Sequence, residues 1–475
     1  MNDNTGLAGF MYLRKFSSRM STNNGLASKV AHQIRVFFQH DPERDEYSDR
    51  RLPDSEKKGW WQPTSVWIGF AIAFSIAFIG SQIYMGLGMP EALYAIIIGN
   101  VILAIYASLI GMAAAEGGLN TPLQIKEAFG KKAGLIPIAI LGLLVNGWYA
   151  FQAWLAADVI RAAWDPNWYL LIVVVTLAFG IPAVIGLDAM SEIVEKLVIP
   201  VMLLFVAYIL FAQVLPAGTG ILSSSAPGES IPFLVGVGLT WGTFAVSGTA
   251  TGDIVRYADD KKAAVLATVI AFLICNTIMM SAGALSAAAL AGADPYFGMI
   301  GLYASIPVIV VAVVSLWSTC DACNYGATMS YTNLSDLISW RLAGTIGIAL
   351  ALITGITEII SHLESWLLLI GVVVPPIGGI IIADYFILRR NTGYDQTLTS
   401  DYNWLALGML LLAMAVNTYA HFNIPEALPG ALGLILAVTL YPLSTVAANK
   451  LFSDQQLGTE TIAYEPPASA QPSDD

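Results

Sequence analysis

Residues 231–256 read IPFLVGVGLTWGTFAVSGTATGDIVR, and this stretch decides the fold. It is apolar enough to cross a membrane, yet glycines and hydroxyl residues interrupt it throughout. These are Gly236, Gly238, Gly242, Gly248 and Gly252, with Thr240, Thr243, Ser247, Thr249 and Thr251. Broken backbone at membrane depth persists only inside protein or beside a cavity, and secondary transporters bind small solutes at such helices. A continuous helix packed closely through its small residues is the alternative.

The whole chain has the composition of a helical membrane protein. Of 475 residues, 56% are hydrophobic and 12% are charged, against roughly 25% charged in a soluble domain. A run of about 20 apolar residues spans a bilayer, and the sequence predicts twelve such spans in an all-α membrane fold. The predicted spans are 62–87, 92–114, 134–162, 169–187, 195–214, 232–252, 262–290, 303–330, 342–360, 364–387, 402–419 and 428–447.

The spans define a predicted transporter domain of residues 59–448. Residues 1–58 form a cytoplasmic N-terminal extension that is polar and lacks the apolar core of a signal peptide. Within it, residues 26–38 have the periodicity of a short helix at the membrane surface. Residues 449–475, rich in Pro, Ser and acidic side chains, are predicted to be a disordered cytoplasmic tail.

Loop charges predict the orientation in the membrane. If the N-terminus is cytoplasmic, the inside loops hold nearly all loop Lys and Arg residues, and the outside loops hold only Arg161. The inside residues are Lys126, Lys131, Lys132, Lys196, Arg256, Lys261, Lys262, Arg341, Arg389 and Arg390. The positive-inside rule therefore predicts a multi-pass protein of the inner or plasma membrane with both termini in the cytoplasm.

The first span is interrupted like the sixth. It carries several glycines and a polar patch, namely Gly69, Gly80, Gly86 and Gly88 with Ser75, Ser81 and Gln82. Interrupted helices five spans apart are typical of an inverted repeat of five plus five helices. The last two spans would then be peripheral.

Span three offers a candidate binding surface. Trp148 and Gln152 are four residues apart and therefore share one helix face. An indole is a flat apolar platform, and an amide can donate to and accept from the edge of a heterocycle. An interhelical hydrogen bond beside a packing tryptophan is the alternative.

Span eight has the densest polar run inside any predicted helix. Its adjacent hydroxyls, Ser318 and Thr319, are oxygen ligands that a small hard cation prefers, and carbonyls freed by a broken first span could complete the shell. Both hydroxyls can instead bond to their own helix. An unpaired carboxylate at Asp321 would be costly at this depth, so Asp321 is a candidate to accept hydrogen bonds or to carry a proton.

Other conspicuous residues have ordinary interpretations. Cys320 and Cys323 have redox-motif spacing but lie in an apolar helix without a second pair, so packing is preferred to a metal or thiol site. Charged residues at cytoplasmic helix ends are expected to cap, to snorkel and to set topology: Asp253, Arg256, Asp384, Arg389 and Arg390. The sequence contains no phosphate-binding loop, zinc-protease motif or nucleophile elbow, so it does not predict an enzyme.

Five segments in chain order resemble the nucleobase–cation symporter (purine/cytosine permease) family, and the bacterial cytosine permeases most closely. The segments are Ile98–Asn100, Gly147–Trp148, Gly248–Tyr257, Trp317–Thr319 with Asp321, and Val373–Tyr385 with Arg389 and Arg390. The resemblance extends from about Trp60 to Val446. It implies a five-plus-five inverted-repeat (LeuT-like) fold with two peripheral helices, alternating access, and import of a nucleobase or related heterocycle with Na⁺ or H⁺.

The resemblance also assigns residues to roles by position. Trp148 and Phe244 would sandwich the planar ring. Its polar edge would meet Gln152, Ser315 and Asn324, and Val246 and Ser247 would lie beside them in the substrate site. Na⁺ would be bound by Ser318 and Thr319 with the backbone carbonyls of Gly69, Ile72 and Phe74. The hydroxyl pair favours Na⁺ over H⁺, with Asp321 as the coupling residue if protons are used instead.

Two departures from the cytosine permeases concern the substrate. Ser315 stands where those permeases have Asn, and Val246 stands where they have Ser, whereas Gln152 and Asn324 are similar to the hydantoin and allantoin branch. Cytosine is the first expectation; a purine, a hydantoin- or allantoin-like ring and a thiamine-precursor pyrimidine are the alternatives. The expected protein acts as a monomer among membrane lipids, binds no nucleic acid, and needs no cofactor besides its coupling ion. A non-transporting solute sensor and an amino-acid symporter of the same fold remain alternatives.

Overall fold

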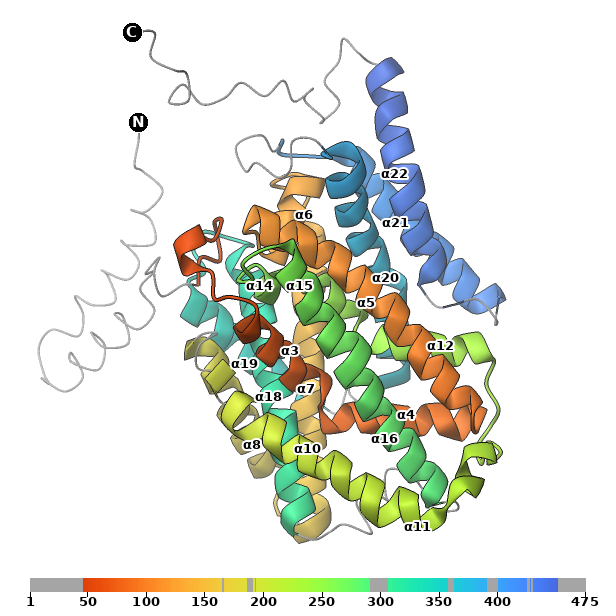
Figure 1. Cartoon of the computed structure of the whole chain (residues 1–475). Helices are drawn as coiled ribbons and strands as arrows, with labels where there is room; N and C mark the ends of the chain where they lie inside the picture. The colour runs from red at the N-terminus through yellow and green to blue at the C-terminus, as the bar shows by residue number, and fades with distance from the viewer. Residues whose placement is uncertain are drawn as a thin grey trace, which may run out of the picture.

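The computed structural model describes residues 46–164, 166–185, 191–192, 194–290, 306–357, 363–390, 400–424, 428 and 430–451. In these ranges all regular structure is helical (Figure 1). The principal helices are α3 (Trp61–Ala71), α4 (Phe74–Leu87), α5 (Glu91–Gly117), α6 (Thr121–Phe129), α7 (Leu135–Trp164), α8 (Trp168–Ile185), α10 (Ile199–Tyr208), α11 (Leu215–Ala217), α12 (Phe233–Thr243), α13 (Ala245–Thr249), α14 (Gly252–Val255), α15 (Lys261–Thr268), α16 (Asn276–Ala289), α18 (Ile306–Thr332), α19 (Trp340–Ile356), α20 (Leu363–Ala383), α21 (Trp404–Asn423) and α22 (Ala431–Leu451). Short 3₁₀ turns lie at Asp54–Glu56 and Thr219–Ser223, and π-helical turns lie at Val194–Val198, Ile209–Val214, Val269–Cys275 and Asp384–Leu388.

Every predicted span overlaps one or more of these helices. Within the described ranges, eight helices are long and apolar enough to cross a membrane, and the bent pair α3–α4 makes a ninth candidate. Three shorter apolar helices, Trp168–Ile181, Phe233–Thr243 and Trp340–Ile356, lie at three further predicted spans. The predicted all-α membrane fold is confirmed. Most of residues 1–58 and 449–475 lie outside the described residues.

The first predicted span is broken in the middle, as expected. Helix α3 ends at Ala71, Ala73 is extended, and α4 leaves at an angle of 50°. The last carbonyls of a helix and the first N–H groups of the next have no partner within their own helix. The break therefore presents both acceptors and donors to neighbouring helices.

The sixth predicted span is also interrupted. Helix α12 ends at Thr243, Phe244 is non-helical, and the short helix α13 follows. Close packing accompanies the break, because a Cβ atom at Gly99 of α5 would lie 2.5 Å from Thr240 and 2.8 Å from the Val237 carbonyl. The broken-helix interpretation of residues 231–256 is therefore confirmed and the continuous-helix alternative is wrong, although Gly99 of α5 does allow the two helices to pack closely.

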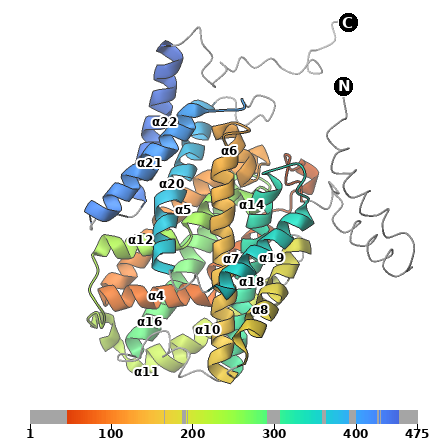
Figure 2. The same cartoon turned by 180° about the vertical axis from the view of Figure 1, so that it is seen from behind.

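The helices form two packed groups that meet along a seam. In the first group, α4, α12–α14, α15 and α16 pack around α5, and α3 packs against α14 and α15. In the second group, α7, α8, α18 and α19 all contact one another, and α7 and α18 lie side by side over much of their length (Figure 2). The two broken spans belong to the first group, and their breaks lie along the seam where α3, α4 and α13 meet α18 and α7.

Helices α21 and α22 are peripheral, as predicted. Only 33% of Trp404–Asn423 and 28% of Ala431–Ala448 are buried, against 72% of Ile309–Thr332 in α18. Large apolar side chains such as Phe422 and Leu443 are exposed on them. Such surfaces match the hydrocarbon of a bilayer, where helices do not need to bury apolar side chains against protein.

Candidate substrate and cation site

Trp148 and Gln152 lie where α7 meets the first break. The Gln152 amide nitrogen donates to the Ser75 hydroxyl of α4 at 2.9 Å, and both side chains are buried. The Gln152 carbonyl and the Trp148 indole N–H have no hydrogen-bond partner within the described part of the chain. Buried polar groups are normally paired. These two atoms are therefore one acceptor and one donor that remain available to a polar ring.

Phe244 lies at the second break, in an aromatic cluster. Its ring is 5.4 Å from the rings of both Phe70 and Phe272, in tilted contacts. Val246 and Ser247 follow it in α13 and are buried. Because α13 packs against α7, the segment that carries Phe244 adjoins the helix that carries Trp148, as the proposed sandwich requires.

Ser315 has a role that the sequence did not reveal. Its hydroxyl oxygen accepts a hydrogen bond from the backbone N–H of Phe74 at 3.1 Å. Phe74 is the first residue of α4, so its N–H has no partner within the helix. Ser315 thus acts as an N-cap supplied by another helix, and it holds α18 against the break.

The cation-site candidates meet at the same point. The Ser318 hydroxyl is 3.4 Å from the Gly69 carbonyl oxygen, and it also lies 2.9 Å from the Ser315 carbonyl. The Thr319 hydroxyl is 3.1 Å from that Ser315 carbonyl. Both hydroxyls thus bond to their own helix, as the sequence alternative allowed, and Ser318 also reaches the end of α3. The hydroxyl and carbonyl oxygens gathered here are of the kind Na⁺ prefers. The contact between Phe74 and Ser315 uses the Phe74 N–H, so it does not test the Phe74 carbonyl as a cation ligand.

Asp321 and Asn324 face α8 and α19. The Asn324 amide donates to the Gly180 carbonyl at 3.0 Å, and its oxygen lies against Gly347 of α19. Asp321 has a backbone hydrogen bond with Ala183 of α8. One oxygen of each side chain has no hydrogen-bond partner among the described residues. The structure therefore joins Asn324 to the helices behind the seam, not to Gln152.

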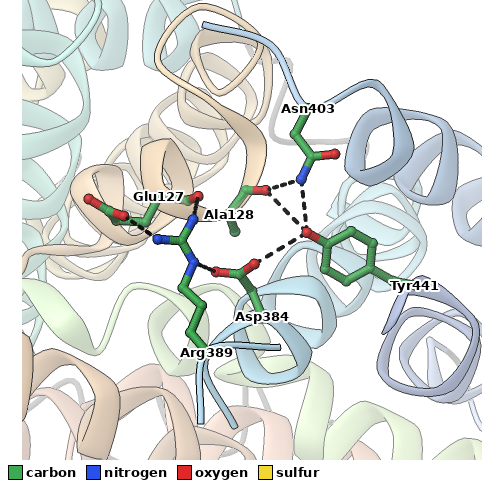
Figure 3. Close-up of polar contacts among 6 residues, drawn as sticks. All are labelled: Glu127, Ala128, Asp384, Arg389, Asn403 and Tyr441. Carbon is green, nitrogen blue, oxygen red and sulfur yellow. Dashed lines mark hydrogen bonds and ion pairs between the residues drawn. The ribbon is translucent and has the colours of Figure 1, made fainter. Parts of the chain in front are cut away.

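Asp384 and Arg389 belong to a buried network and are not a helix-end pair that snorkels (Figure 3). Arg389 Nη1 lies 2.9 Å from Glu127 Oε2 of α6, and Arg389 Nε lies 3.0 Å from Asp384 Oδ2. Tyr441 of α22 donates to Asp384 at 3.3 Å, and Asn403 donates to the Tyr441 hydroxyl at 2.9 Å. The network fastens α21 and α22 to α6 and α20.

The snorkelling interpretation is also wrong for Arg256. Its side chain is fully buried, and its guanidinium donates to the backbone carbonyls of Glu46 and Tyr47, which precede α3. Asp253 is buried as well and accepts a hydrogen bond from the Thr121 N–H at 2.9 Å. Sequence alone could not reveal this, because Glu46 and Arg256 are 210 residues apart.

Comparison with known proteins identifies the family. The family described as permeases for cytosine/purines, uracil, thiamine and allantoin matches residues 52–434, which is most of the chain. The chain belongs to this permease family. It is therefore a membrane transporter of that family and not an enzyme, as the sequence predicted.

Individual relatives agree with this assignment. The cytosine permease of Escherichia coli (strain K12) is 29% identical over 85% of this chain and 96% of its own length. The hydantoin permease of Microbacterium maritypicum is 24% identical over 79% of this chain and 83% of its own length. The chain is thus similar both to a cytosine permease and to a hydantoin permease.

Solved structures confirm the fold. Mhp1, a nucleobase-cation-symport-1 family transporter with bromovinylhydantoin bound in a closed conformation, superposes with a TM-score of 0.71. It is 22% identical, and the match covers 87% of this chain and 97% of Mhp1. A Na⁺-coupled sialic acid symporter superposes with a TM-score of 0.63 at 13% identity, over 90% of this chain and 97% of that one. The LeuT-like architecture expected from the two interrupted spans is confirmed.

Proposed function

We propose that this chain imports a nucleobase or related heterocycle together with Na⁺, by alternating access at the seam between the two helix groups. The observation that carries the proposal is the polar bridge across the seam: Ser318 reaches the Gly69 carbonyl, and Ser315 reaches the Phe74 N–H. A cation bound between α18 and the break would link both groups. Its binding would then favour the arrangement that also holds the substrate.

We assign the ring of the substrate to Trp148 and Phe244, and its polar edge to Gln152 with Val246 and Ser247 beside it. The unpartnered Gln152 carbonyl and Trp148 N–H support this assignment, since a heterocycle with adjacent donors and acceptors would satisfy both. Cytosine is our first candidate because of the cytosine permease relative. A hydantoin-like ring is the second, because of the hydantoin permease relative and Gln152; a purine or a thiamine-precursor pyrimidine would fit the same contacts.

We assign Na⁺ to Ser318 and Thr319 with the carbonyls of Gly69 and Ser315, and we keep Ile72 as a further backbone ligand. In this assignment Phe74 and Ser315 position the break, and Asn324 positions α18. Proton coupling is the alternative, and the unpartnered oxygen of the buried Asp321 favours it. A carboxylate in that position must hold a proton, a cation or a further hydrogen bond.

We further propose that the protein works as a monomer in the inner or plasma membrane, with both termini in the cytoplasm. The small-molecule ring, the coupling ion and the surrounding lipid are then its only partners, and no nucleic acid or resident cofactor takes part. In this orientation the end of the molecule that carries α6, α14 and the start of α15 faces the cytoplasm.

Uptake of labelled cytosine into proteoliposomes, competed by purines, pyrimidines, hydantoin and allantoin, tests the substrate assignment. Cytosine uptake that Gln152→Ala abolishes and that a neighbouring lipid-facing change, Leu143→Ala, leaves intact would support it. If no ring in the panel is transported or competes, the proposed substrate class is wrong. If hydantoin alone is transported, the proposed substrate class is supported, and the pocket residues place this chain with the hydantoin-transporting relatives.

A further inference from the structure

The segment Glu46–Lys58, which precedes α3, lies across the ends of several helices, and we call it the strap. It is drawn in red beside α14 in Figure 1. Leu52 is fully buried, and its N–H donates to the Gly118 carbonyl at 2.8 Å. Farther along, the Lys58 N–H donates to the Tyr257 carbonyl at 2.8 Å. The strap is therefore integrated with the transporter helices.

The strap supplies the partners of a buried charge. The Arg256 guanidinium, which is 0% exposed, donates to the Tyr47 carbonyl at 3.0 Å and to the Glu46 carbonyl at 2.5 Å. A buried charge is costly when it loses its partners. If the strap left while the helices stayed in place, Arg256 would lose both carbonyls. Departure of the strap is thus linked to entry of water at this end.

The carboxylate of Glu46 joins the two helix groups. It accepts a hydrogen bond from the Tyr257 hydroxyl at 2.6 Å, on the first group, and from the Tyr325 hydroxyl at 3.5 Å, on the second. Burial raises the pKa of Tyr257 well above its usual value, so this hydroxyl stays protonated and can donate.

A second point of the strap repeats the arrangement. The Ser48 carbonyl accepts from the Asn120 side chain at 2.6 Å and from the Asn333 side chain at 2.7 Å. Asn120 follows α5 of the first group, and Asn333 follows α18 of the second. Two residues apart, Glu46 and Ser48 therefore both bridge the seam at the same end of the molecule.

We propose that the strap is a conformational lock: when docked, it holds the two helix groups together at this end, and it must leave before this end can open. The proposal rests on the proposed function for alternating access and for the direction of opening, toward the cytoplasm. A permanent brace, in contrast, would stay docked in every state.

The docking of the strap can be measured with a thiol at Ser48, which is 2% exposed. Ser48→Cys would be made in a background where Cys275, Cys320 and Cys323 are replaced by Ala. Reaction with a membrane-impermeant maleimide in nanodiscs then reports undocking. Glu46→Ala should raise the labelling rate at least tenfold, because two hydrogen bonds to a carboxylate are lost.

The matched control is Asp54→Ala in the same strap. Asp54 is 78% exposed and pairs with Lys57, three residues away. This change should leave the labelling rate within about twofold. Equal labelling of the Glu46→Ala and Asp54→Ala proteins would overturn the assignment of the bridge to Glu46.

Opening itself can be measured between the two helix groups. Spin labels at Lys262→Cys of the first group and Leu337→Cys of the second are both on exposed positions. The full chain gives the reference distance distribution. A chain that begins at residue 53 should add a population at longer distance. An unchanged distribution in that chain would contradict the lock.

If the shorter chain does not fold, the same distances are measured in the full chain with Glu46→Ala, which should also add a population at longer distance. An unchanged distance distribution in that variant would overturn the proposal. The distance measurement needs no substrate, so it separates the two proposals. Longer distances without transport of any ring would leave the lock standing and the proposed function wrong. Transport with unchanged distances would support the proposed function and overturn the lock.

Discussion

Replacing Arg389 by Met should be among the most destabilising single changes outside the seam. The guanidinium side chain is 13% exposed and lies between the carboxylates of Glu127 and Asp384, which are 3% and 5% exposed. It also donates to the Glu127 carbonyl at 2.8 Å. Met occupies similar space but leaves two buried carboxylates facing each other without a positive charge.

The expected loss follows from this geometry. Removing one partner of a buried ion pair costs about 3–5 kcal/mol, because the other partner remains buried and unpaired. Two carboxylates lose their partner here, which places the effect at the upper end of that range. At roughly 2 °C per kcal/mol for a large chain, a loss of about 5 kcal/mol should lower the melting temperature in detergent by about 10 °C.

The next residue provides the control. Arg390 is exposed, and Arg390→Met should change the free energy of unfolding by no more than about 0.5 kcal/mol. Adding Glu127→Gln to Arg389→Met should restore part of the loss, because the amide carries no charge. If Arg389→Met and Arg390→Met melt at the same temperature, the network does not stabilise the attachment of α21 and α22, and the reasoning is refuted.

Three further outcomes are expected. Trp148→Ala should abolish uptake in a protein that still elutes as a folded monodisperse species; undiminished uptake would remove Trp148 from the site. Thr319→Ala should weaken the dependence of uptake on Na⁺, since one proposed hydroxyl ligand is lost. An unchanged sodium titration would instead favour proton coupling through Asp321. Gly283→Ala should lower the free energy of unfolding by about 1–3 kcal/mol, because its Cβ would meet a backbone carbonyl of the facing helix α4. The control Gly408→Ala, with open space around the glycine, should be neutral or stabilising. Equal melting temperatures of the two variants would contradict the close crossing of α16 and α4.

Much of the fold could be predicted from local sequence patterns. Apolar runs predicted the spans, and glycine with hydroxyl residues predicted both interrupted helices. Helix α6 was missed although its N-terminus has a recognisable signature. Asn120 caps it by accepting from the Leu123 N–H, and Pro122 lies in its first turn. This Asn-x-Pro pattern favours a helix start, but the nine-residue helix Thr121–Phe129 is too short to be noticed in a search for membrane spans.

The candidate site was harder to predict because its contacts join distant segments. Periodicity placed Trp148 and Gln152 on one face, and the structure brings Gln152 to the first break, 77 residues earlier. The same reasoning could not decide which face of α18 meets the break, so the capping role of Ser315 was not predicted. Nor could a helix-end arginine be recognised as buried, since Glu46 is 210 residues from Arg256 and Glu127 is 262 residues from Arg389.

The most direct test of the account is accumulation of labelled cytosine in proteoliposomes under an inward Na⁺ gradient, compared with the same vesicles in which K⁺ replaces Na⁺. Sodium coupling predicts transient accumulation above the external concentration with Na⁺, and equilibration at most without it. Accumulation that is equal in both, or that follows a pH gradient instead, would contradict sodium coupling at Ser318 and Thr319.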